Sequence, residues 1–96
     1  MPQVHIRSES DIPQGWRYVI EIDHDDGSHS THRLRLAWVD HNHWAGERSI
    51  TPSRVAQALV EYLLAAELEE PLPARFDAAT VRRWLPAIDE ELAGVL

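Results

Sequence analysis

The sequence predicts a small α+β domain in which a β-hairpin packs against a helical C-terminal half. Three observations predict this class: alternating apolar residues over 16–24, a second alternation over 29–39, and helical spacing of apolar residues after residue 51. The chain has 96 residues, so we treat 1–96 as one domain with one core. Hydrophobic residues make up 44% and charged residues 26%, proportions that argue against a disordered chain.

The N-terminal segment predicts one strand followed by a loop. Val4 and Ile6 alternate with polar neighbours, as they do in a half-buried strand. Residues 8–15 contain Pro13 and Gly15, which are typical of loops. We therefore expect a short N-terminal strand beside the hairpin.

The hairpin 16–24/29–39 is predicted by two alternating segments around a turn that contains Asp26-Gly27. A two-residue turn there would oppose the apolar stripe of one strand to the charged stripe of the other. Because side chains alternate with a period of two, a one-residue change of register restores the match. We therefore predict an odd loop, Asp25-Asp26-Gly27, with Gly27 in the left-handed conformation. The resulting cross-strand neighbours are Tyr18 with Leu34 and Trp16 with Leu36. The other face displays Arg17, Glu21, Asp23, Thr31, Arg33 and Arg35.

Two C-terminal helices complete the predicted fold. Thr51 is a typical N-cap and Pro52 fits the first helical position, so the first helix begins there and runs to about residue 68. Asp77 is the expected cap of the second helix, which Pro86 should kink or split. Residues 40–50 show no periodicity and predict a connection. The predicted order is βββαα, with helices on one face of an antiparallel sheet of about three strands.

Charge and composition exclude several classes of function. The net charge is −7: residues 1–60 hold six Arg against eight acids, and residues 61–96 hold three Arg against eight. Such an acidic chain is not expected to bind duplex nucleic acid. The absence of cysteine excludes disulfides, thiolate zinc sites and cysteine nucleophiles. The stretch 55–68 is too short and too polar to cross a membrane, and no signal peptide is evident, so we expect a cytoplasmic protein.

Histidines near the hairpin tip suggest a metal site. His24, His29 and His32 lie close in sequence to Asp23, Asp25 and Asp26, and imidazole with carboxylate suits zinc or another divalent metal. The predicted register, however, places His24 and His32 on the apolar face and His29 on the other. We therefore interpret them as solvated side chains at the end of a hairpin.

A second pair, His41 and His43, follows Asp40. The Asp40-His41 step resembles the opening of an HNH nuclease hairpin, but that family needs a further histidine, and none occurs after His43. We therefore reject the nuclease interpretation. A metal-binding protein remains an alternative, with these two and the three hairpin histidines as candidate ligands: His24, His29, His32, His41 and His43.

No sequence motif predicts catalysis. The serines near His41 lack a Gly-x-Ser-x-Gly elbow, and Gly46 is neither in a glycine-rich loop nor beside a lysine. We expect no cofactor and no enzymatic activity, with a small hydrolase-like site kept as an alternative.

The remaining candidates are surfaces for a partner. Trp16, Trp38 and Trp84 fall on apolar stripes, which predicts core packing. Trp44 lies on no stripe and is either a binding anchor or a lid on the core. We expect a non-enzymatic module that binds another protein or a second copy of itself as a homodimer. Its candidate binding residues are Trp44, Arg17, Arg33 and Arg35. A second alternative is single-stranded nucleic-acid binding through the arginines of the sheet face.

Overall fold

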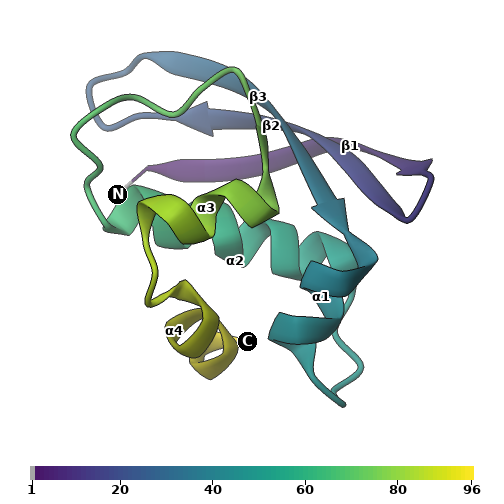
Figure 1. Ribbon diagram of the computed structural model, residues 1–96. Coiled ribbons are helices and arrows are strands. Elements are labelled where there is room, and N and C mark those ends of the chain that lie inside the picture. The colour runs from purple at the N-terminus through teal and green to yellow at the C-terminus, as the bar shows by residue number, and fades with distance from the viewer. Residues whose placement is uncertain (1) are drawn as a thin grey trace.

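The computed structural model describes residues 2–96, which form a sheet with helices on one of its faces (Figure 1). Within this part of the chain the strands are β1 (Gln3–Ile12), β2 (Gly15–Asp23), β3 (His29–Ala37) and β4 (Arg75–Asp77). The helices are α1 (Trp38–Ala45), α2 (Pro52–Ala65), α3 (Ala78–Trp84) and α4 (Ile88–Val95). The predicted α+β class is confirmed, with more elements than expected.

The sheet has the order β1-β2-β3-β4 and is mixed. β1, β2 and β3 are antiparallel neighbours, whereas β4 runs parallel to β3. The prediction of a purely antiparallel sheet of about three strands is therefore wrong in this detail. β4 has only three residues, which is too short for an alternating pattern to be visible in the sequence.

The hairpin has the predicted register. Tyr18 pairs with Leu34 and Trp16 with Leu36. The amide of His24 donates to the carbonyl of Ser28 at 2.9 Å, and Gly27 has a φ of 87°. The loop between His24 and Ser28 is therefore Asp25-Asp26-Gly27. Glycine occupies its left-handed position, a backbone conformation that residues with a side chain rarely adopt.

β1 is longer than predicted. Residues 8–12 were expected to belong to a loop, but they continue the strand and pair with β2. The register shifts between Ile6 and Ser8, so Arg7 forms a bulge that interrupts the alternation. A strand with an internal bulge loses the period-two pattern, which explains why the sequence indicated only its first half. The turn to β2 contains Gln14, at a φ of 63°.

Helix α1 occupies most of the predicted connection 40–50. Its only buried residues are Asp40, Trp44 and Ala45, so it shows no continuous apolar stripe in the sequence. β3 ends at Ala37 rather than at residue 39, and Trp38 begins the helix with 53% of its surface exposed. The prediction that Trp38 packs in the core is wrong, because the change from strand to helix turns it outward.

The expected C-terminal helices are present with altered boundaries. The Thr51 hydroxyl accepts a hydrogen bond from the amide of Arg54 at 3.3 Å, which is the predicted cap of α2. α2 ends at Ala65, a few residues before the expected position. As predicted, the chain around Pro86 is not continuous helix: α3 ends at Trp84 and α4 begins at Ile88. Asp77 precedes α3, but its side chain makes no capping hydrogen bond.

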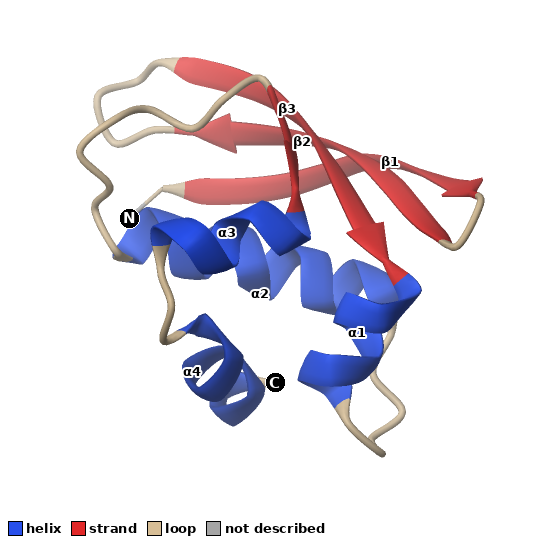
Figure 2. Ribbon diagram, in the orientation of Figure 1, coloured by secondary structure: helices blue, strands red, loops and turns tan. Residues whose placement is uncertain are grey.

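The core lies between the inner face of the sheet and the helices. Its large, fully buried side chains are Tyr18, Ile20, Ile22, Leu34, Leu36, Trp44, Val55, Leu59, Val60, Leu63, Ile88 and Leu92. None of the helices within residues 2–96 is both long and apolar enough to span a lipid bilayer. Figure 2 shows that the opposite face of the strands carries no helix. This outer face holds the three candidate arginines, Arg17, Arg33 and Arg35, together with His29.

Candidate interaction face of the sheet

The outer face of the sheet displays charged side chains in cross-strand rows. Asp23 lies opposite His29 at one end of the hairpin, and Glu21 opposite Thr31 in the next row. Further along, Val19 lies opposite Arg33, and Arg17 lies opposite Arg35. The predicted outward residues are all partly or fully exposed, as the side-chain parity of the hairpin required.

Four arginines form one cluster at the far end of this face. Arg17 lies directly opposite Arg35 on the neighbouring strand, and Arg33 directly opposite Arg75. These residues, the arginine cluster, line a shallow hollow of about 260 Å³ together with Asp77. Like charges directly opposite one another destabilise a sheet, so this arrangement costs the isolated fold stability.

The four arginines are only partly balanced by acids: of the residues that line the hollow, Asp77 is the acidic one, and it lies opposite Arg35. Within residues 2–96 none of its four guanidinium groups makes a side-chain hydrogen bond or an ion pair. Arg7, by contrast, makes two hydrogen bonds to Glu21, at 3.1 and 3.3 Å. The hydrogen bond from Arg7 is also the main cause of the lowered pKa of Glu21. The cluster is therefore a local concentration of positive charge on an acidic protein.

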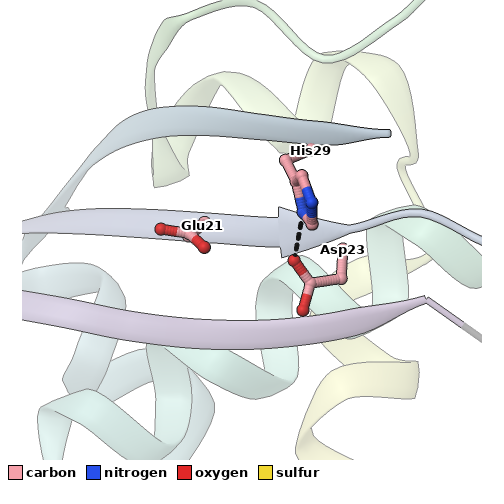
Figure 3. Close-up of side chains that lie close together, drawn as sticks. All are labelled: Glu21, Asp23 and His29. Atoms are coloured by element: carbon pink, nitrogen blue, oxygen red, sulfur yellow. Dashed lines mark hydrogen bonds and ion pairs between the residues drawn. The ribbon is translucent and has the colours of Figure 1, made fainter. Parts of the chain in front are cut away.

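A different group of side chains gathers at the hairpin-tip end of the same face. His29 Nδ1 lies 2.6 Å from Asp23 Oδ1, and His5 Nε2 lies 3.1 Å from Asp23 Oδ2. Glu21 is directly adjacent, and Figure 3 shows its carboxylate beside Asp23 and His29. We call these four residues the histidine–carboxylate cluster. The hydrogen bond from His29 is the largest cause of the lowered pKa of Asp23, partial desolvation opposes it, and the hydrogen bond from His5 reinforces it.

The histidines predicted to face the core lie on the other side of the sheet from His29. His24 Nε2 and His32 Nε2 each lie 2.8 Å from the Ser30 hydroxyl. His32 Nδ1 lies 2.7 Å from the carbonyl of Pro73, so we assign the proton to Nδ1 and make Nε2 an acceptor for Ser30. This chain of hydrogen bonds connects the hairpin to the segment before β4.

The two histidines of α1 lie apart from those of the hairpin. His41 Nε2 donates to the carbonyl of Ile50 at 2.7 Å, and its ring lies edge-on to Trp16. His43 lies 3.5 Å from Asp89. The five histidines predicted as metal ligands are therefore distributed over separate places, and the structure does not bring them together as one site.

Trp44 belongs to the core. Its side chain is fully buried, so the ring is not accessible to a partner. Of the two alternatives, a binding anchor and a lid on the core, the structure fits the lid. Its indole Nε1 donates to Asp89 Oδ1 at 2.8 Å. Arg82 lies over the ring at 4.9 Å and donates to Asp40 at 2.6 Å and to Asp89 at 2.8 Å.

These side chains form a polar network between α1, α3 and α4. Burial raises the pKa of Asp89, but the hydrogen bonds from Arg82 and Trp44 outweigh burial, so that this pKa is lower than usual. Trp44 was not on a sequence stripe because its environment comes from two other helices. The network therefore explains why Trp44 is buried, which the sequence did not decide.

Two members of the clusters were missed by sequence reasoning. Arg75 reaches the arginine cluster only because β4 joins the sheet, and His5 reaches Asp23 only through the pairing of β1 with β2. His5 carried one local signal, its place in the alternation with Val4 and Ile6.

No protein-family model matches the chain, and no significantly similar curated protein or solved structure was found.

Proposed function

We propose that this chain is a non-enzymatic interaction module that binds an acidic protein segment on the arginine cluster. One observation carries the proposal: four adjacent arginines on the helix-free face have no side-chain partner within residues 2–96. A domain that tolerates two like-charged cross-strand pairs retains a feature that lowers its own stability. A bound partner with negative charge removes that repulsion.

Carboxylates are the ligands that best fit this surface. A guanidinium presents a planar fork of donors that matches a carboxylate in two parallel hydrogen bonds. The row of Arg17 and Arg35 and the row of Arg33 and Arg75 lie two residues apart along the strands. That separation is about 7 Å, which equals the spacing of alternate side chains in an extended peptide. An extended segment with acids at every second position therefore matches both rows.

A nucleic acid is the less favoured partner. Proteins that bind single strands combine positive charge with exposed aromatic side chains on which bases stack. The outer rows of β2 and β3 contain no aromatic residue, since their aromatic side chains face the core.

Self-association through a strand edge is also less favoured. Both strands of the hairpin already have neighbours, because β2 pairs with β1 and part of β3 pairs with β4. The long free edge belongs to β1, which is interrupted by the bulge at Arg7 and carries acids at Glu9 and Asp11. Bulges and charges on an edge strand disfavour pairing with a second chain.

The direct test is fluorescence anisotropy with a labelled ten-residue peptide that alternates glutamate and serine. We expect binding to the wild-type chain, weakened by about tenfold in Arg33→Gln/Arg35→Gln through loss of charge-assisted hydrogen bonds. The matched control is Arg54→Gln/Arg83→Gln, which removes the same net charge from exposed positions on helices. This control should bind the peptide as the wild type does.

Three results would contradict the proposal. Equally weakened peptide binding in both double variants would show that the peptide responds to net charge and not to the arginine cluster. Tighter binding of a labelled oligothymidylate than of the peptide would favour single-stranded nucleic acid. Sedimentation equilibrium showing a dimer that dissociates in Arg33→Gln/Arg35→Gln would make a second copy of the chain the partner.

A further inference from the structure

The histidine–carboxylate cluster has the composition of a metal site, and it is independent of the arginine cluster. One ligand atom each from Glu21, Asp23 and His29 can be chosen so that all three lie within 4.8 Å of one another. His5 contacts the same Asp23 carboxylate through its other oxygen. The four side chains come from three neighbouring strands, so hydrogen-bonded sheet rather than loop determines their spacing.

We propose that Glu21, Asp23 and His29 bind one divalent transition-metal ion of the zinc type, and that His5 orients Asp23. A nitrogen and two carboxylate oxygens are ligands that zinc and its neighbours accept, and the imidazole disfavours magnesium and calcium. Bonds of about 2.1 Å in a tetrahedral site separate ligand atoms by roughly 3.4 Å. His29 Nδ1 and Asp23 Oδ1, now 2.6 Å apart, must move apart, and the longer separations must shorten. These movements are of roughly 1 Å, which rotation of exposed side chains provides.

Exposure leaves room for the ion and for water. The side chain of Asp23 is 37% exposed and that of His29 is 67% exposed. Three protein ligands then leave one position open, as in zinc sites that hold a water molecule. The proton between His29 Nδ1 and Asp23 moves to the other ring nitrogen, or leaves, when the metal takes its place.

Arg7 acts against this site. Its two hydrogen bonds hold the Glu21 carboxylate, and its positive charge lies beside the ligands. Removing that charge releases Glu21 for the metal and removes a repulsion. Arg7→Gln is therefore expected to bind the metal more tightly than the wild type, an outcome opposite to that of a ligand variant.

The experiment is isothermal titration calorimetry of the chelator-treated full chain with zinc, and separately with magnesium. We expect one zinc ion per chain, a loss of affinity of about tenfold or more in Asp23→Asn and His29→Gln, and a gain in Arg7→Gln. His43→Gln is the matched control, because His43 is another exposed histidine that pairs with a carboxylate, Asp89, at 3.5 Å. It should bind zinc as the wild type does.

A second measurement does not depend on variants. Manganese added to the ¹⁵N-labelled chain should broaden amide signals most strongly around residues 5, 21, 23 and 29 and least in α1, which follows the opposite end of β3 from His29. Zinc affinity that is unchanged in Asp23→Asn, or equally reduced in His43→Gln, would overturn the proposal. Magnesium bound as tightly as zinc, or broadening centred elsewhere, would also overturn it.

Discussion

Replacing Arg82 with methionine tests whether the polar network between α1, α3 and α4 holds the helices together. The substitution keeps an unbranched side chain of similar length and removes the guanidinium. Arg82 donates to Asp40 and Asp89 and lies over the ring of Trp44. The Asp40 side chain is only 7% exposed, so the substitution leaves a buried carboxylate without its ion-pair partner.

The magnitude depends on burial. Removing one partner of a buried ion pair costs about 3–5 kcal/mol of stability. We take about 3 kcal/mol for the loss of the pair with Asp40, because the side chain of Arg82 is partly exposed to solvent. The pair with Asp89, whose side chain is 35% exposed, contributes at most about 1 kcal/mol. The cation–π contact with Trp44 adds roughly 1 kcal/mol. We therefore expect Arg82→Met to lower the free energy of unfolding by about 4–5 kcal/mol, a large part of the 5–15 typical of a small domain.

The assay is urea and thermal unfolding followed by far-UV circular dichroism. The unfolding entropy of 96 residues is about 0.2 kcal/mol/K, so the expected loss lowers Tm by about 20 °C. Arg83→Met is the matched control on the same helix, because Arg83 is exposed, and it should change stability by less than about 0.5 kcal/mol. Asp40→Leu/Arg82→Met removes both partners and should be more stable than Arg82→Met alone.

Acidification provides an independent check of the same network. The pKa of Asp89 is lowered in the folded chain, so its ionised form stabilises the fold above the unfolded value of about 3.9, and this contribution is lost as pH falls through the folded pKa. Arg82→Met removes the main interaction that lowers this pKa. The stability difference between wild type and variant should narrow below about pH 4. A loss below about 1 kcal/mol at pH 7, or a difference independent of pH, would refute the reasoning.

Two further predictions concern the backbone and the core. Gly27→Ala should lower the free energy of unfolding by about 1 kcal/mol because its φ is 87°, whereas Gly94→Ala, in open space on α4, should raise it by up to about 1 kcal/mol. Urea unfolding of both variants measures this, and a change of the same sign in both would exclude backbone conformation as the cause. Leu59→Ala should cost about 3 kcal/mol, because Leu59 is fully buried on α2 and its truncation leaves a cavity. The same titration measures it, and a loss below about 1 kcal/mol would show that the core collapses around the site.

The local chemistry of the sequence was sufficient for part of the fold. Alternation with a period of two, combined with Asp-Asp-Gly, predicted the hairpin register and the left-handed Gly27. Thr51 before Pro52 predicted the start of α2, and Pro86 predicted the break between α3 and α4. Each of these signals acts within one element or one turn, so no knowledge of the rest of the chain is needed.

The candidate sites were only partly visible in the sequence. Side-chain parity placed Arg17, Arg33 and Arg35 on one face and separated His29 from His24. Parity did not identify what lies beside them on neighbouring strands. The fourth arginine and the second histidine of the two clusters come from β4 and β1, whose pairing is set by packing between distant segments.

The sequence by itself therefore determined which face of the two hairpin strands points outward, where the hairpin turns and where α2 begins. Tertiary structure alone decided that Arg75 joins the arginines, that Asp23 lies between His5 and His29, and that Trp44 is buried. The physical reason is one of range. Periodicity reports the two faces of a single strand or helix, whereas neighbours across a sheet or between helices depend on contacts between residues far apart in the chain.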